Sequence, residues 1–256
     1  MKNIILVLLF ISVGSCQPTS NEDNKETEDI QAVGAHHSKS IQNVFEAHGG
    51  FEAWSNQRQL TFERGGEKHV VELQSRKVRI EAADWTIGSD GSDVWISPLE
   101  NSYKGDARFF HNLYFYFFSM PFVVGDPGVF YEELEDREIL GVNYGAVQIS
   151  YDAGVGDSPK DNYIVYYDKV TNKMAWLMYT VTFRSQESSE NFSLIKYEDW
   201  KDISGVVLPS KLVWYVYKDG VVGAPRREVI FENITLSTGI PENALFVIPP
   251  DGKIVE

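Results

Sequence analysis

The chain has 256 residues, of which 37 are acidic and 23 basic, giving a formal net charge of -14. Binding to nucleic acid, or to an anionic membrane surface through a basic patch, requires clustered lysine and arginine side chains, so this charge argues against both. Hydrophobic residues make up 43% of the chain, which is ordinary for a globular protein. Single all-β domains of this length are common.

The first residues have the pattern of an exported protein. Lys2 precedes an unbroken apolar run from Ile4 to Ile11, which fits a signal peptide and is far shorter than the roughly 20 residues that cross a bilayer. The segment Val13-Gly14-Ser15-Cys16 resembles the lipobox of bacterial lipoproteins. Cys16 is the only cysteine, so lipidation also accounts for an unpaired thiol in an exported chain. We therefore predict a signal peptide at residues 1–15 and membrane anchoring through Cys16.

Residues 16–38 are polar and acidic and have no hydrophobic period, which predicts a flexible tether. Gln17 stands where lipoproteins retained in the inner membrane often have Asp. The lipobox resemblance therefore implies the outer membrane and leaves its periplasmic or surface face open. His36 and His37 lie in this tether, as solvated linker residues or as ligands of a stray metal ion.

Residues 39–256 are expected to form a single domain that begins with a helix. Ile41, Val44 and Phe45 recur at helical spacing within residues 40–57, and Gly49-Gly50 is expected to end or kink this helix. The hydrophobic period then changes to two, which predicts short strands near residues 60–62, 70–73, 78–80 and 94–96.

A densely aromatic segment at residues 107–120 interrupts the strands. Its residues Phe110, Tyr114, Phe117 and Phe118 fall at i, i+4, i+7 and i+8, which favours a helix, although this aromatic content also suits a strand. The segment is too apolar to lie in water and must pack on a sheet or cover a pocket. Further strands are expected at residues 146–151, 163–168, 175–183, 191–197, 211–217 and 228–236.

These elements predict a mainly β (α+β) fold. The expected architecture is a strongly curved antiparallel sheet, or half-open β-barrel, with about two helices packed in its concave side. Spacing between the strands is typical of a meander, and no long helices separate them as a parallel sheet would require.

This order of elements behind a lipobox resembles the LolA/LolB-like lipoprotein-carrier superfamily, and more narrowly an uncharacterised family of Gram-negative outer-membrane lipoproteins. The matching stretches are Ala47-His48-Gly49-Gly50 followed by Trp54, then Tyr116–Pro121, Asp126-Pro127-Gly128 and Gly205–Pro209. The superfamily resemblance implies an open barrel whose concave face binds acyl chains or other hydrophobic ligands. A free shuttle is not implied, because this chain has a lipobox of its own.

His48 is the most specific polar candidate, because it directly precedes Gly49-Gly50. It is either a ligand contact or acid–base group, or a helix C-cap whose imidazole bonds the last carbonyl groups. His69 and His111 have no partner at ligand spacing, so no metal and no cofactor is predicted. The acidic segments 89–93 and 152–161 lack the ligand pattern of an EF-hand and are expected to be turns.

No sequence motif requires an enzyme. Neither Gly-x-Ser-x-Gly nor a Walker loop is present, and the carboxylates at residues 132–136 are expected on an exposed strand edge rather than as a glycosidase pair. A hydrolase built around His48 would need a second titratable group within hydrogen-bond reach.

The remaining candidates are apolar side chains that the helices and early strands would bring together: Trp54, Trp85, Trp95, Phe109, Phe110, Phe117, Met120 and Phe122. They either line a ligand cavity or fill the core, as side chains of small barrels do. Our first hypothesis is a monomeric, non-enzymatic envelope lipoprotein that binds a lipid acyl chain or another hydrophobic small molecule in a half-barrel cavity. The second is a structural or interaction lipoprotein of the envelope with a filled barrel and no ligand.

Overall fold

The computed structural model describes residues 37–98, 103–151 and 160–255. The predicted signal peptide, Cys16 and the tether up to residue 36 lie outside the described residues, as does most of the acidic segment 152–161. The residues from Gly34 to Glu256 cluster into one compact unit, which contains every described residue.

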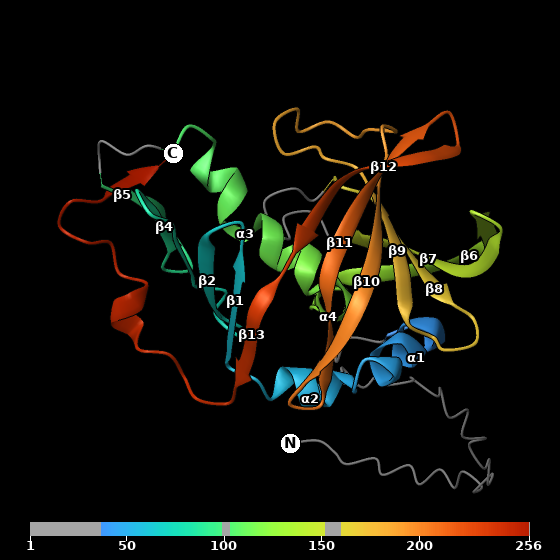
Figure 1. Cartoon of the computed structure of the whole chain (residues 1–256), viewed down its shortest axis with the longest axis horizontal. Coiled ribbons are helices and arrows are strands. Elements are labelled where there is room, and N and C mark those ends of the chain that lie inside the picture. The colour runs from blue at the N-terminus through green and yellow to red at the C-terminus, as the bar shows by residue number, and fades with distance from the viewer. Residues whose placement is uncertain (1–36, 99–102, 152–159, 256) are drawn as a thin grey trace, which may run out of the picture. The chain divides into compact units, whose positions relative to one another are not determined.

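Two antiparallel sheets of seven strands each make up most of the domain (Figure 1). The first has the order β13-β1-β2-β3-β4-β5-β14, with strands β1 (Gln59–Arg64), β2 (Glu67–Glu72), β3 (Val78–Glu81), β4 (Thr86–Ser89), β5 (Val94–Ser97), β13 (Glu232–Ser237) and β14 (Lys253–Val255). The second has the order β12-β11-β10-β9-β8-β7-β6, with strands β6 (Val129–Ile139), β7 (Val142–Tyr151), β8 (Tyr163–Asp168), β9 (Met174–Tyr179), β10 (Ser193–Ile203), β11 (Val206–Lys218) and β12 (Val221–Ile230). The mainly β, antiparallel prediction is confirmed.

The expected single curved sheet is divided in two where the chain passes from β12 to β13. Phe231 stands between these strands and is fully buried, with its ring 5.4 Å from that of Phe62 and 4.6 Å from that of Phe118. The strand predicted at residues 228–236 is therefore divided between two strands. β12 pairs with β11, β13 pairs with β1, and the buried Phe231 stands between them.

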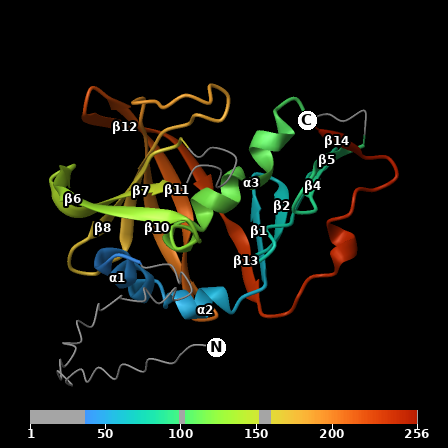
Figure 2. The ribbon, with the colours of Figure 1, turned by 180° about the vertical axis from the view of Figure 1, so that it is seen from behind.

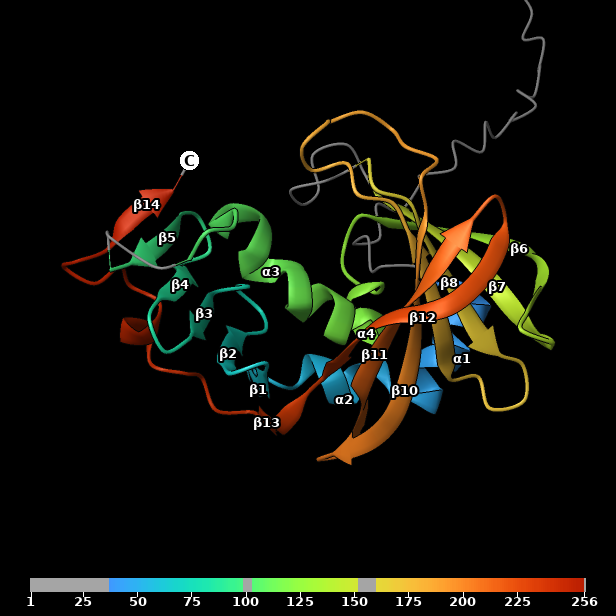
Figure 3. The same ribbon diagram turned by 45° about the horizontal axis from the view of Figure 1, so that its top comes forward.

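Four α-helices accompany the sheets in the described part of the chain: α1 (Lys39–Ala47), α2 (Phe51–Ser55), α3 (Ala107–Phe118) and α4 (Met120–Val123). A short 3₁₀ turn spans Asn243–Leu245. The expected helix at residues 40–57 is thus broken at Gly49-Gly50, where both glycines have positive φ. The aromatic segment is a helix, as its spacing predicts. It lies between the two sheets and contacts β3, β4 and β5 of the first and β11 of the second (Figure 3).

Side chains from both sheets and the helices form one large core. Its largest members include Phe45, Phe62, Phe118 and Phe122, each at most 2% exposed. A smaller cluster lies on the opposite face of the second sheet and contains Tyr166, Trp176 and Met178 among its buried members. The view from behind shows β6 and β12 at the two edges of this sheet (Figure 2).

Arg137 of β6 joins those two edges. Its guanidinium donates to the hydroxyl groups of Tyr166 at 3.1 Å and Tyr217 at 2.9 Å, and to the carbonyl of Gly220 at 3.2 Å. Tyr217 belongs to β11 and Gly220 to the turn before β12. These bonds therefore link β6, at one edge of the sheet, to the β11–β12 hairpin at the other edge. Arg137 therefore lies against the smaller cluster, where it also contacts the sulfur of Met178 at 3.7 Å.

Candidate functional site

A pocket of about 270 Å³, the larger pocket, runs along α3. Its apolar wall is formed by α3 and α4, which contribute Phe109, Leu113, Tyr116, Phe117, Met120 and Val123. The other lining residues come from β7 and β8 of the second sheet, from the segment before β8 and from the segment after β9: Tyr151, Tyr163, Asp161 and Phe183. Arg108, Asn112 and Asp126 complete the lining. This pocket is therefore apolar along the helix and polar at its margins.

The local sequence accounts for the orientation of α3. The side chain of Asp106 accepts a hydrogen bond from the amide of Phe109 at 3.0 Å, which caps the first turn. Phe109, Leu113 and Tyr116 are spaced i, i+4 and i+7, so they share one face of the helix. All three are only half-buried, whereas Phe115 and Phe118 are at most 1% exposed and belong to the core. Hence α3 packs through one face and leaves a second apolar face on the pocket.

Asp161 lies at the polar margin and is held by neighbouring donors. Its Oδ1 accepts from the amide of Thr182 at 2.6 Å and from the hydroxyl of Thr182 at 2.8 Å, and its Oδ2 accepts from the hydroxyl of Tyr163 at 3.3 Å. Burial raises the pKa of Asp161 more than these bonds lower it. Burial likewise raises the pKa of Tyr163 well above its ordinary value. The margin therefore holds buried polar groups that are already hydrogen-bonded.

A smaller pocket of about 130 Å³ adjoins the first, because Arg108 and Asn112 line both. Its other lining residues are Arg76, Ser89, Gly91, Ser92, Val94 and His111. Nδ1 of His111 lies 2.5 Å from the carbonyl oxygen of Arg108, so that nitrogen carries the proton. The side-chain amide of Asn112 then donates to Nε2 of His111 at 2.7 Å. This second pocket is mostly polar, and no carboxylate is among its lining residues within the described chain.

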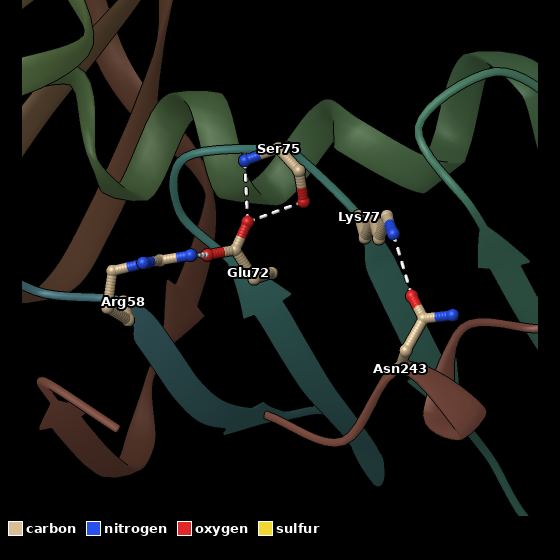
Figure 4. Close-up of polar contacts among 5 residues, drawn as sticks. All are labelled: Arg58, Glu72, Ser75, Lys77 and Asn243. Carbon is tan, nitrogen blue, oxygen red and sulfur yellow. Dashed lines mark hydrogen bonds and ion pairs between the residues drawn. The ribbon is translucent and has the colours of Figure 1, made fainter. Parts of the chain in front are cut away.

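The turn between β2 and β3 holds Arg76 in place. The carboxylate of Glu72 accepts from Arg58 at 2.9 Å and from the amide and hydroxyl groups of Ser75 at 2.5 Å each (Figure 4). Burial alone would raise the pKa of Glu72, but these bonds outweigh it and lower that pKa. On the other side of the turn, Lys77 donates to Asn243 at 2.7 Å (Figure 4). Arg76 is therefore carried by a turn that is fixed on both sides.

Three of the predicted cavity residues line the larger pocket, namely Phe109, Phe117 and Met120. Trp54 and Phe122 instead stack on each other in the core, with ring centroids 4.9 Å apart. Trp95 faces the opposite side of the first sheet, where its indole N–H donates to the carbonyl of Phe246 at 2.9 Å. The structure therefore divides this set between the pocket and tightly packed positions.

Trp85 and Phe110 pack against the large core together with Tyr103. Their rings lie 4.8 Å and 5.4 Å from that of Tyr103. Neither lines either of the two pockets.

His48 is fully buried and bonded only to backbone atoms. Its Nδ1 donates to the carbonyl of Val207 at 3.0 Å, and its Nε2 accepts from the amide of Met174 at 3.1 Å. Burial lowers the pKa of His48 to about 4. His48 caps α1 as expected, but its imidazole bonds strands β9 and β11 rather than the carbonyls of the helix. With both ring nitrogens engaged by backbone, His48 joins three elements and has no titratable partner for acid–base chemistry.

Several lining residues were not among the sequence candidates. Leu113 and Tyr116 continue the i, i+4, i+7 series that starts at Phe109, so helical periodicity could have placed them on the same face as Phe109. Asp126, Asp161 and Phe183 come from loops, whose approach to α3 has no signal in the sequence. His37, expected in the tether, packs its ring 4.9 Å from those of Phe45 and Phe51, and Ser38 caps α1.

Within the described residues, no group of three or more His, Cys, Asp or Glu side chains is placed to hold a metal ion. None of the helices there has both the length and the apolar composition needed to cross a membrane.

No protein-family model and no curated protein matches the chain. Solved structures with a similar fold include a DUF1329 family protein from Desulfovibrio piger (11% identity, 82% of this chain and 98% of that one, TM-score 0.46). A LolA superfamily protein from Nitrosomonas europaea matches at 10% identity over the same shares, also with a TM-score of 0.46. A putative outer membrane lipoprotein-sorting protein domain from Vibrio parahaemolyticus matches at 9% identity, over 78% of this chain and 96% of that one, with a TM-score of 0.41.

Proposed function

We propose that this chain is a non-enzymatic lipoprotein of the cell envelope that binds a lipid acyl chain or similar hydrophobic molecule in the pocket along α3. The observation that carries the proposal is the half-buried apolar face of α3. Phe109, Leu113 and Tyr116 present this face to a pocket of about 270 Å³ instead of packing it against a sheet. An apolar helix face left open to water is unfavourable, and an acyl chain would cover it.

The size of the pocket favours a single chain. Pockets for small molecules commonly measure about 300–1,000 Å³, and this one lies just below that range. Each methylene group that leaves water contributes about 0.8 kcal/mol, so even part of one acyl chain supplies substantial binding free energy. Attachment to the outer membrane through lipidated Cys16 would hold such a pocket next to a source of acyl chains.

A second candidate is an interaction lipoprotein that holds no ligand. Trp54, Trp95 and Phe122, three of the side chains expected around a cavity, are at most 5% exposed and occupy packed positions. Such packing favours an interior that is already filled away from the α3 pocket. The two functions differ in whether the pocket takes up lipid.

Native mass spectrometry of residues 17–256, followed by organic extraction, separates the two functions. This chain omits Cys16 and keeps the whole unit from Gly34 to Glu256. The binding proposal predicts a co-purifying lipid, or uptake of one added acyl chain per molecule. An apo mass that persists with both fatty acid and phospholipid added would overturn it and favour the interaction role.

A further inference from the structure

The smaller pocket beside the acyl-chain site has the composition of an anion-binding site. Two arginines, Arg76 and Arg108, line it together with the hydroxyl-bearing residues Ser89 and Ser92. Guanidinium and hydroxyl groups are the donors that bind carboxylate and phosphate oxygens. Since the whole chain has a formal net charge of -14, a cationic lining here is a local feature and not a general property of the surface.

Arg76 has a buried donor group left over. Its Nη2 bonds Asp126, but its Nη1 is buried and finds no hydrogen-bond partner among the described residues. A buried donor without a partner costs free energy, so native proteins almost always supply one. Arg76 also lines the smaller pocket.

Among the described residues, two carboxylates near this pocket, those of Asp126 and Asp90, already have partners. Asp126 pairs with Arg76 and lines the larger pocket. Asp90 belongs to the turn between β4 and β5, where its Oδ1 accepts from the amides of Ser92 and Asp93 at 2.9 Å each. Gly91 of that turn packs so near the other turn that an added Cβ would lie 3.2 Å from the carbonyl of Ser75. Two fixed turns therefore form the walls, and Arg108 adds a second positive charge.

One face of α3 connects the two pockets. Arg108 and Asn112 are spaced i, i+4 and line both pockets, while Phe109 and Leu113 beside them line the larger one only. A chain lying along the apolar pocket would therefore bring its polar end to Arg108.

We propose that the smaller pocket binds the anionic head group, a carboxylate or phosphate, of an amphiphile whose chain occupies the larger pocket. This inference rests on the proposed function and names its ligand class as anionic single-chain amphiphiles.

Isothermal titration of residues 17–256 with dodecanoate and with monododecanoyl glycerol tests the proposal, both below their aggregation concentrations. The two probes share a chain and differ in head-group charge. We expect dodecanoate to bind at least about tenfold more tightly, as charge-assisted hydrogen bonds of this kind require. Inorganic phosphate and acetate, each titrated alone, are expected to bind far more weakly than dodecanoate.

Arg108 lines both pockets, so Arg108→Gln should weaken binding of both probes, and it should reduce the affinity for dodecanoate about tenfold more than the affinity for the neutral glyceride. Arg79→Gln is the control, because Arg79 lies on β3, pairs with Glu81 and lines neither pocket. The double variant Arg76→Gln with Asp126→Asn removes both charges of one ion pair and should also reduce the preference for dodecanoate.

The outcomes separate the two proposals. Equal affinities for both probes, or equal losses in the Arg108 and Arg79 variants, would overturn the head-group site and leave the acyl-chain site standing. Failure of both probes to bind would remove the proposed function itself. Tight binding of inorganic phosphate alone would indicate a free-anion site and contradict the link to the acyl chain.

Discussion

Arg76 and Asp126 form an ion pair that joins the linings of the two pockets. Nη2 of Arg76 lies 2.6 Å from both carboxylate oxygens of Asp126. Arg76 comes from the β2–β3 turn of the first sheet and lines the smaller pocket, whereas Asp126 follows α4 and lines the larger one. Burial raises the pKa of Asp126 more than the guanidinium lowers it. The pair thus holds a partly buried carboxylate between the first sheet and the segment that enters the second.

Arg76→Met should destabilise the protein by about 1–2 kcal/mol at pH 7.5, because it leaves the partly buried carboxylate of Asp126 without its partner. The loss should shrink as the pH falls, since the raised pKa of Asp126 allows this carboxyl to become neutral above the usual range. Urea unfolding at pH 7.5 and pH 4.5 measures both effects. Arg79→Met, which breaks the more exposed pair with Glu81, should cost less than about 1 kcal/mol. Losses of similar size at both pH values, or in both variants, would contradict this account of the pair.

Leu113→Gln should weaken binding of a neutral acyl ligand about tenfold or more, because it places an amide in the apolar wall of the pocket. Leu113 is half-buried, so the variant should still fold. Leu245→Gln is the matched control on an exposed leucine outside both pockets. Titration with monododecanoyl glycerol, alongside urea unfolding, checks the pair of variants. The α3 pocket is ruled out as the binding site if Leu113→Gln folds and binds as well as the control.

The buried imidazole of His48 predicts a loss of stability in mild acid. Its pKa is about 4 in the folded protein against an ordinary value of 6.5, so the unfolded chain takes up a proton first as the pH falls. The contribution of His48 is complete above pH 6.5 and declines toward pH 4, by about 2 kcal/mol between pH 7.5 and pH 5. His48→Asn should show a decline smaller by about that amount in urea unfolding. Burial also lowers the pKa of His69. Because the native protein and the His48→Asn variant both contain His69, its effect cancels in the comparison. Parallel declines in the two proteins would contradict the assignment.

Gly49 and Gly50 offer a matched test of how α1 meets the β10–β11 turn. Both have positive φ, +99° and +94°, so alanine is strained at either position. An added Cβ at Gly49 would lie 2.0 Å from the carbonyl oxygen of Gly205, whereas one at Gly50 meets nothing within 4 Å. We expect Gly50→Ala to cost about 1 kcal/mol and Gly49→Ala about 3 kcal/mol or more in urea unfolding. Equal costs would show that α1 does not pack closely against this turn.

The sequence predicted those elements whose hydrophobic period reflects burial on one side. The aromatic helix was predicted because Phe110, Tyr114, Phe117 and Phe118 repeat at helical spacing. Strand β8 was predicted with the same bounds that the structure shows. Strand β6 was expected only as an exposed strand edge at residues 132–136, and β12 only from residue 228 onward, because both are edge strands with mostly exposed side chains and little alternation. β14 pairs with β5 through only three residues, too few for a period to appear.

The site was less predictable than the fold, because a sequence does not distinguish a side chain that lines a pocket from one that packs. Phe109 and Phe122 are both aromatic and lie on neighbouring helices, yet the first faces the pocket and the second stacks on Trp54. That difference depends on which face of each helix meets a sheet. The approach of Arg76 to Arg108 depends on tertiary contacts between segments far apart in the chain.

The most direct test of the acyl-chain site is to map where a bound chain lies. Residues 17–256 would be mixed with a fatty acid that carries a diazirine midway along its chain, irradiated, and digested for peptide mass spectrometry. The account predicts crosslinks to the α3 face that holds Phe109, Leu113 and Tyr116, and to the facing residue Phe183, with Leu113→Gln reducing the yield. Crosslinks confined to exposed apolar side chains elsewhere, such as Phe130 on β6, would contradict the proposed site.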